Sequence, residues 1–412
     1  MIEDTKLFGM PAESGRWLFV VIGLVMNVCL GAVYAYSIFL GPVKKAFNVS
    51  ASMANLPFMV FLSFFAILMF FGGRIMEKLG PRKLIITGSI IVGLGWMLSS
   101  FAPNIWILTL TYGVIAGSGV GLVYGCPVAT AARWFPDKKG LAVGLMLAGF
   151  GGSALITGKI ASLMIPAVGL PTTFLYFGIV FGIVLVILGL PFRFPVAGWK
   201  PAGWTPAAGS MAAADFMPAD MIKTPTYWGL FFCFMIGSIA GLMAIGISKP
   251  VGSEIIKISG ETAATLVGVF ACFNAIGRPL FGFITDKLTA RYATMINLAI
   301  ILLVSILMIK AGEGDTNLYV ISFVGFWLCL GGWLAIAPAA TATFFGMKNY
   351  ARNYGVVFFA YGLGAIIGGI ISGQAKDVFG TYTVAFYPTA VLAVVGLVLA
   401  FVLLKMPKPK KA

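Results

Sequence analysis

The stretch Gly73-Arg-Ile-Met-Glu-Lys-Leu-Gly-Pro-Arg-Lys83 indicates the fold better than any other part of the chain, because much of it occurs twice. The second copy, Gly282-Phe-Ile-Thr-Asp-Lys-Leu-Thr-Ala-Arg291, keeps glycine, acid, Lys, Leu and Arg at the same spacing. Each copy joins two long apolar runs, and such a repeat predicts two similar halves. The matched residues are Gly73, Glu77, Lys78 and Arg82 in the first copy and Gly282, Asp286, Lys287 and Arg291 in the second.

The composition is that of a protein that crosses a membrane many times. Of the 412 residues, 60% are hydrophobic and 10% are charged, and the mean hydropathy is +1.01. About 20 apolar residues are enough for an α-helix to cross roughly 30 Å of hydrocarbon. We therefore expect an all-α membrane protein with twelve transmembrane helices in two pseudo-symmetric six-helix bundles. The expected spans are 17–41, 53–75, 84–102, 105–131, 141–165, 172–192, 225–248, 262–284, 294–311, 317–345, 354–375 and 383–404.

The loops predict the domain organisation and the orientation. We expect bundles at 1–192 and 225–412, joined by a cytoplasmic linker at 193–224 that is rich in Pro, Gly and Ala. Lys and Arg are enriched in cytoplasmic loops. Apart from Lys159 and Arg278 within spans, most lie on the side of both termini, and the opposite side has only Lys44, Lys45, Lys249, Lys257, Lys310 and Lys376. Both termini are thus expected in the cytoplasm, with an uncleaved first span in the inner membrane.

Several function classes find no support in the sequence. The net charge of +15 is explained by this topology and by contact with anionic lipids, so we expect no nucleic-acid partner. The chain has no histidine, and its five cysteines show no CxxC spacing, so we expect neither a metal nor a cofactor. A channel would show charged rings or a filter motif, and an enzyme would show clustered catalytic groups near one face. Neither pattern occurs, and a transporter remains.

Arg278 is the strongest candidate for a functional residue. It lies inside an expected span, whereas none of the 13 acidic residues lies in any expected span. An ionisable side chain at bilayer depth costs about 2.5 to 3.5 kcal/mol on insertion scales and usually marks a substrate or ion pathway. A buried cation without an acidic neighbour predicts that the substrate itself is an anion.

The repeated stretch resembles a motif of the major facilitator superfamily, in loops 2-3 and 8-9. There, the glycine lets two helices approach closely, and the acid pairs with a neighbouring span in one of two conformations. The resemblance implies a two-bundle transporter in which Gly73, Glu77, Lys78 and Arg82, with Gly282, Asp286, Lys287 and Arg291, form a conformational latch. The alternative is that each basic turn only reflects the general enrichment of Lys and Arg in cytoplasmic loops.

Three further segments resemble the oxalate:formate antiporter family, which is related to the proton-coupled monocarboxylate transporters. They are Arg133-Trp-Phe-Pro-Asp-Lys-Lys-Gly-Leu-Ala142, Ala351-Arg-Asn-Tyr-Gly355 and Asn274-Ala-Ile-Gly-Arg-Pro-Leu-Phe-Gly282. The likeness extends over all twelve spans. It implies that Arg278 binds the substrate carboxylate.

Differences from these families narrow the substrate. Oxalate-carrying members have a second cation where this chain has Tyr361, and one cation beside a phenol suits a monoanion better than a dianion. Animal monocarboxylate carriers have an acid where this chain has Asn274 and a lysine where it has Tyr36. Asn274 lies one helical turn before Arg278, so both can reach one ligand. The proton pathway of those carriers therefore has no counterpart here: no carboxylate lies within a span to carry the proton, and Asp377 lies at the outer end of the eleventh span.

The remaining site residues are inferred from position. Tyrosine can donate a hydrogen bond to a carboxylate while its ring excludes water. We expect Tyr34 and Tyr36 in span 1, Tyr124 in span 4 and Tyr361 in span 11 at the site, with Phe358 against the alkyl part of the substrate. Packing and interface belts are the alternative roles of such aromatic residues.

These observations predict a secondary transporter that moves a small monocarboxylate with a proton by alternating access. L-Lactate is the expected substrate, with pyruvate, acetate and formate as further candidates, and the carrier is expected to work as a monomer in the bilayer. An electroneutral carboxylate exchanger is the alternative, because an empty site would carry the unpaired charge of Arg278 across the membrane. A membrane sensor of organic acids that transports nothing is a remote alternative.

Overall fold

The computed structural model describes residues 6–196, 199–201 and 215–407, which form an almost entirely helical protein. Eleven helices in this part of the chain are long and apolar enough to cross a membrane. One of them, α3 (Ala51–Ser99), contains two of the expected spans. They are separated at Gly80, where the backbone leaves the helical conformation (φ 76°, ψ 165°). The expected twelve spans are therefore present in two bundles.

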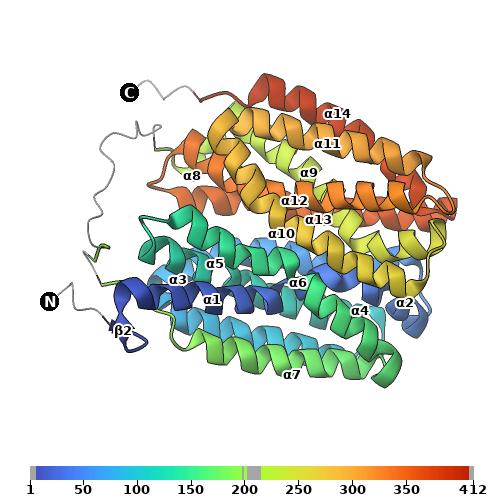
Figure 1. The fold of residues 1–412 in the computed structure, drawn as a ribbon, viewed down its shortest axis with the longest axis horizontal. Coiled ribbons are helices and arrows are strands. Elements are labelled where there is room, and N and C mark those ends of the chain that lie inside the picture. Colours follow the sequence, from blue (N-terminus) through green and yellow to red (C-terminus); the bar gives the residue numbers. More distant parts are fainter. Residues whose placement is uncertain (1–5, 197–198, 202–214, 408–412) are drawn as a thin grey trace.

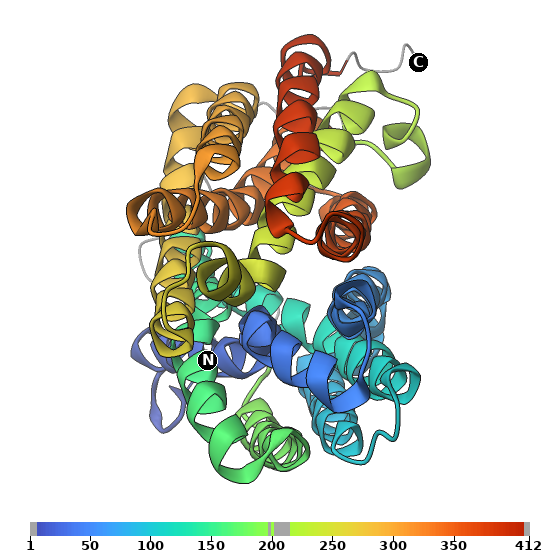
Figure 2. The ribbon, with the colours of Figure 1, turned by 90° about the vertical axis from the view of Figure 1, so that its right-hand side faces the viewer.

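The first bundle comprises α1 to α7 and the second comprises α9 to α14. Figure 2 shows the first bundle below the second, and Figure 1 shows the helices running lengthwise through both. The helices of the first bundle are α1 (Ala12–Leu30), η1 (Gly31–Ala35), α2 (Tyr36–Phe47), α3, α4 (Ile105–Leu108), η2 (Thr109–Ala116), α5 (Gly117–Trp134), α6 (Lys139–Val168) and α7 (Leu170–Gly189). Those of the second are α9 (Pro225–Pro250), η3 (Val251–Ile255), α10 (Gly260–Leu288), α11 (Ala290–Lys310), α12 (Thr316–Phe345), α13 (Tyr350–Phe379), η4 (Tyr382–Ala385) and α14 (Phe386–Leu403).

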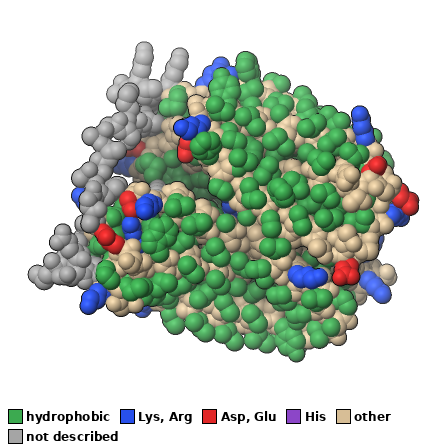
Figure 3. Space-filling model, in the orientation of Figure 1, with side chains coloured by type: hydrophobic (Ala, Val, Ile, Leu, Met, Phe, Trp, Pro, Cys, Tyr) green, Lys and Arg blue, Asp and Glu red, His purple; other side chains and the backbone are tan. Residues whose placement is uncertain are grey.

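The turns between the helices gather at two ends of the molecule, which we call the near end and the far end. The near end has the turns at Gly80, Asp137, Thr289 and Gly346, and the far end has those at Asn48, Gly169, Lys257 and Gly380. A small hairpin of β1 (Lys6–Leu7) and β2 (Met10–Pro11) and the end of α14 also lie at the near end (Figure 1). The short helix α8 (Pro218–Met221) precedes α9 there. Figure 3 shows charged side chains mainly at these two ends, with a hydrophobic band between them.

The repeat is visible in the backbone as well as in the sequence. Thr289, between α10 and α11, has φ 83° and ψ 157°, nearly the conformation of Gly80 in the first copy. This region is accessible almost only to glycine, so the second copy holds a strained threonine at the same place. Both turns reverse the chain within a few residues.

A bidentate ion pair anchors α1 at the near end. Both guanidinium NH2 groups of Arg16 donate to the Asp137 carboxylate, at 2.6 and 2.8 Å, and Arg16 also donates to the carbonyl oxygen of Trp134. Arg16 is 5% exposed. Asp137 belongs to the segment between spans 4 and 5 that was singled out in the sequence. The hydrogen bonds from Arg16 hold the pKa of this carboxyl below its ordinary value.

We expect Asp137→Asn to lower the free energy of unfolding by about 2 kcal/mol at pH 7, because Arg16 loses a charged acceptor. Asp137 has a lowered pKa, so its contribution is present above the unfolded pKa, near pH 4, and is lost as the pH falls through the lower folded value. Thermal unfolding of both proteins in detergent between pH 7 and pH 3 checks this. A stability difference that does not shrink at the acid end would contradict it.

Candidate functional site

Arg278 lies where the two bundles meet and is buried without an acidic partner among the described residues. It is 3% exposed, and none of its three guanidinium nitrogens has a hydrogen-bond partner among the described residues. Its guanidinium carbon lies 5.8 Å from the ring centroid of Phe150 on α6. It also interacts electrostatically with the hydroxyl of Tyr124 on α5. A buried cation in this state is costly and is relieved by an anion.

Two predicted tyrosines meet directly across the bundles. The hydroxyl of Tyr34, in η1, lies 2.8 Å from that of Tyr361, on α13, and both side chains are fully buried. Both interact electrostatically with Arg278. Tyr34, Tyr124, Tyr361 and Arg278 therefore form one polar group contributed by both bundles.

Aromatic rings enclose this polar group. The rings of Tyr34 and Tyr124 lie 5.1 and 5.2 Å from that of Phe150, and Phe358 stacks on Tyr361 at 4.9 Å. Phe65 of α3 contacts Tyr124, Phe150, Phe358 and Tyr361. The arrangement provides an apolar wall around one charge, which suits a small ion with a short apolar part.

Asn274 is placed beside the group but is held differently from the expectation. Its amide nitrogen donates to the carbonyl oxygen of Trp327 at 3.0 Å, while its side-chain oxygen has no partner among the described residues. That oxygen faces Gly151 of α6. Asn274 therefore also belongs to the contact between the two bundles.

The structure does not bring Tyr36 to Arg278. Its hydroxyl donates to the carbonyl oxygen of Ala54 at 2.6 Å, and its ring stacks on Phe58. Both contacts lie within the first bundle, towards the far end. Tyr36 therefore packs in the first bundle, away from the polar group.

Sequence reasoning missed four aromatic residues around the group: Phe65, Phe150, Trp327 and Tyr354. Tyr354 interacts electrostatically with Arg278 and lies in the Ala351-to-Gly355 segment, which was noted only as a resemblance. Phe150 lies among the glycines of span 5. No charge or spacing marks these residues in the sequence, and only their positions across the two bundles reveal them.

A cavity of about 410 Å³ leads from the near end towards this group. Its lining is mostly small and apolar and comes from α3, α5, α6, α12 and α13; the larger polar residues in it are Arg133, Tyr124, Tyr350 and Tyr354. Figure 3 shows the surface hollowed towards the end that carries the hairpin. The cavity therefore lies between the bundles and approaches Arg278 through Tyr124 and Tyr354.

The hydrogen bonds between the bundles are confined to the middle and the far end of the described structure. Besides the Tyr34 and Tyr361 pair, Ser63 donates to the carbonyl oxygen of Gly362, and Asp377 accepts from the amides of Ala51 and Ser52. The described residues form no such bond at the near end. The molecule is thus open at the near end and closed at the far end.

The repeated motif lies at the open end. Gly73 lines the cavity, and Gly282 has Ala335 as its nearest neighbour. Arg291 donates to the carbonyl oxygen of Phe401. The side chains of Glu77, Lys78, Arg82, Asp286 and Lys287 are exposed, and neither acid takes part in the ion pairs formed among the described residues. Among the described residues, the motif forms no hydrogen bond or ion pair between the bundles in this conformation.

Comparison with known proteins agrees with this architecture. Residues 20–332 and, in a second match, 229–412 fit the Major Facilitator Superfamily. The oxalate:formate antiporter of Oxalobacter formigenes is 31% identical over 99% of this chain and 95% of its own length, and monocarboxylate transporter 13 of Rattus norvegicus is 25% identical over 79% and 74%. A bacterial homologue of the human lysosomal transporter Spinster, solved in an inward-facing, unoccupied conformation, has a similar fold. Its TM-score is 0.71 at 16% identity, covering 96% of this chain and 99% of that one.

Proposed function

Because the chain belongs to the major facilitator superfamily and is a transporter of organic anions, we propose that it moves a small monocarboxylate such as L-lactate together with a proton. Pyruvate, acetate and formate are further substrates of the same class. The observation that carries the proposal is Arg278, a buried guanidinium that pairs with no acid among the described residues and lies beside tyrosine hydroxyls inside an aromatic wall.

Charge and size both favour a monocarboxylate in this site. The guanidinium fork can hold one carboxylate through two parallel hydrogen bonds. Tyr124 and the Tyr34 and Tyr361 pair can donate further bonds to a carboxylate or to a 2-hydroxyl group. Phe150 and Phe358 can cover a short alkyl chain. A second carboxylate would meet the phenol of Tyr361 instead of a cation.

The transport cycle that we propose is alternating access. In the present conformation the near end, proposed to face the cytoplasm together with both termini, admits the anion through the cavity. Closure at that end would bring the repeated motif into contact with the other bundle, with Gly73, Glu77, Lys78 and Arg82 and their counterparts Gly282, Asp286, Lys287 and Arg291 acting as the latch. A single chain holds the complete site, so we propose that it works as a monomer.

Carboxylate exchange is the second candidate. An empty site would have to carry the unpaired charge of Arg278 through the closed state, which is costly. A loaded site would be nearly neutral. Exchange avoids the empty return, whereas net transport needs a proton or another compensating charge.

Tyr361→Lys tests the substrate assignment. A second cation should let the site hold a dianion, so we expect oxalate uptake to rise at least about tenfold while L-lactate uptake falls. Uptake of both radiolabelled acids into proteoliposomes is the measurement, with Tyr361→Phe as the control that removes the hydroxyl without adding charge. If the wild-type protein already carries oxalate as well as L-lactate, the proposed preference is wrong.

A further inference from the structure

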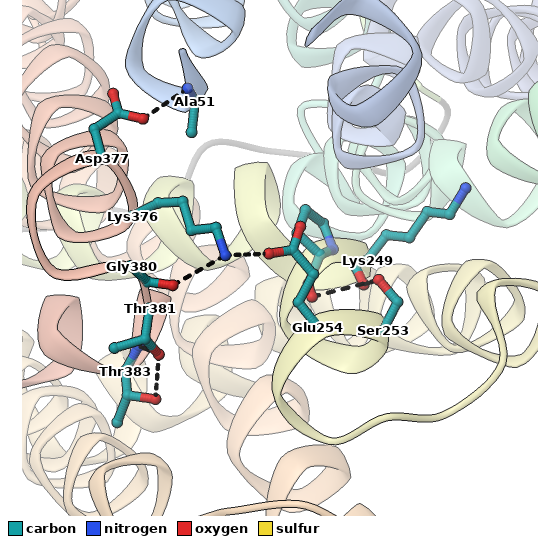
Figure 4. A network of polar contacts seen from close by, with 10 residues as sticks. Ala51, Lys249, Ser253, Glu254, Lys376, Asp377, Gly380, Thr381 and Thr383 are labelled. Carbon is teal, nitrogen blue, oxygen red and sulfur yellow. Dashed lines mark hydrogen bonds and ion pairs between the residues drawn. The ribbon is translucent and has the colours of Figure 1, made fainter. Parts of the chain in front are cut away.

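Asp377 forms hydrogen bonds between the two bundles at the closed far end. It lies near the end of α13, and its two carboxylate oxygens accept hydrogen bonds from the backbone amides of Ala51 at 2.8 Å and Ser52 at 2.9 Å. These amides are at the start of α3, in the other bundle (Figure 4). Among the hydrogen bonds of the described residues, this is the contact between the bundles that involves a charged side chain.

The start of α3 is well suited to hold a carboxylate. The first amides of a helix have no partner within the helix, and the helix dipole favours negative charge there. The hydroxyl of Ser50 accepts the amide of Met53, so it leaves those of Ala51 and Ser52 free for another acceptor. Asp377 supplies both bonds from the second bundle, and they must break if the bundles separate at this end.

Among the described residues, the pseudo-symmetric corner of the far end has no such contact. The helix α10 begins like α3, because the hydroxyl of Ser259 accepts the amide of Thr262. In the described part of the chain, no side chain of the first bundle accepts a bond from the first amides of α10. The two bundles are therefore fastened at the far end by one charged contact, at the corner of α3 and α13.

The lysines described near Asp377 do not pair with its carboxylate, which bonds to the start of α3 instead. Lys376 turns to Glu254 in η3 and to the carbonyl oxygen of Gly380, all within the second bundle (Figure 4). Tyr382 of η4 lies close enough to interact electrostatically with both acids. The lysines at this end on α2 and α9, namely Lys44, Lys45 and Lys249, form no ion pair with Asp377 in the described structure.

We propose that Asp377 is the latch that holds the far end of the transport pathway shut, and that its removal shifts the unloaded carrier towards opening at that end. The inference rests on the proposed alternating-access function, because it assigns a residue to one of its two gates. Asp377 is then the counterpart of the repeated motif at the near end. In the present conformation the Asp377 latch is closed and the latch of the repeated motif is open.

Distances between spin labels on the two bundles test the latch without any substrate. Lys45→Cys and Lys257→Cys place one label on each bundle at the far end, at exposed positions, after the five native cysteines are replaced. Pulsed electron paramagnetic resonance on the reconstituted protein then gives the populations of close and separated bundles. In Asp377→Asn we expect the ratio of separated to close bundles to rise at least about tenfold, the change that corresponds to one hydrogen bond to a charged group.

Ala51→Pro is a second variant that leaves every charge in place. Proline is favoured at the first position of a helix, and the extended backbone of Ser50 suits a following proline. The variant removes one of the two amide donors, so a smaller shift in the same direction is expected. Combining it with Asp377→Asn should add little. The control is Glu254→Gln, which removes the neighbouring acid and should leave the wild-type distances.

The proposal is overturned if Asp377→Asn keeps the wild-type distance distribution, or if Glu254→Gln shifts it equally, since that would show only a general effect of negative charge. A shift in Asp377→Asn without any shift in Ala51→Pro would also contradict it, because the carboxylate would then act elsewhere. These outcomes are independent of substrate. Failure of L-lactate transport in a protein whose labels respond as expected would reject the proposed substrate and leave the latch in place.

Discussion

Arg278→Gln is expected to abolish binding and transport of the monocarboxylate while making the empty protein no less stable. The guanidinium is the one charge that the site offers to a carboxylate, and losing a charge-assisted bidentate contact should weaken binding at least about 100-fold. The empty protein should tolerate the change, because it removes a buried cation that has no acidic partner in the part of the chain that the structure describes. Thermal unfolding with and without L-lactate measures the loss of binding and the stability of the empty protein in one experiment.

Arg278→Lys is the matched control for this prediction. It keeps the positive charge but loses the planar fork, so intermediate binding is expected. A lower melting temperature for Arg278→Gln together with unchanged stabilisation by L-lactate would show that Arg278 is structural. Stabilisation of the wild type that disappears in the variant would place the substrate at the guanidinium.

Of the substitutions proposed here, Gly331→Ala is expected to have the largest effect on folding. Gly331 lies on α12, and a methyl group there would overlap the backbone carbonyl oxygen of Asn274 on α10. The reverse holds for Gly277 of α10, which packs on the carbonyl oxygen of Leu328 on α12. The two backbones touch, so neither can yield without moving a helix. We expect a loss of about 3 kcal/mol or more, seen as loss of monodisperse protein in detergent.

Gly152→Ala on α6 is the control for this prediction. Its added methyl group would lie 3.8 Å from the nearest atom, the Cβ of Ala275, which is ordinary contact. Alanine also has the better helix propensity. If Gly331→Ala and Gly152→Ala yield the same amount of folded protein, the close approach of α10 and α12 does not have the expected importance for folding.

The fold was predictable from the sequence because it depends on local patterns. Apolar length determines a membrane span, and the repeated stretch from Gly73 to Lys83 determines the two halves. The importance of Arg278 was predictable as well, because no acid lies in any of the expected spans and this can be read directly from the sequence. What was not predictable locally is the strained conformation of Thr289, which repeats the backbone of Gly80 without a glycine.

The site was predictable only in part, because it forms between the bundles. The hydrogen bond between Tyr34 and Tyr361 joins residues of the first and the eleventh span, and no pattern in either span indicates the other. Tyr36 shows the opposite error. Its position in span 1 suggested a place at the site, but residues two apart on a helix do not share a face, and Tyr36 reaches Ala54 while Tyr34 reaches Tyr361.

Asp377 illustrates the same limit at the far end. In the sequence it is one acid after the eleventh span, noted only because no carboxylate lies within a span to carry a proton. Its meaning depends on the start of α3, which lies beside it only in the folded protein. Polar residues at the ends of spans therefore need the structure before a role can be assigned to them.

Accumulation of radiolabelled L-lactate in proteoliposomes, with and without a proton gradient directed inwards, tests the central claim most directly. A proton-linked monocarboxylate carrier concentrates L-lactate when the gradient is present and only equilibrates it when the gradient is absent, and Arg278→Gln does neither. Uptake that needs an anion inside the vesicle and ignores the gradient would establish an exchanger instead. No L-lactate flux in either format would contradict the proposed substrate.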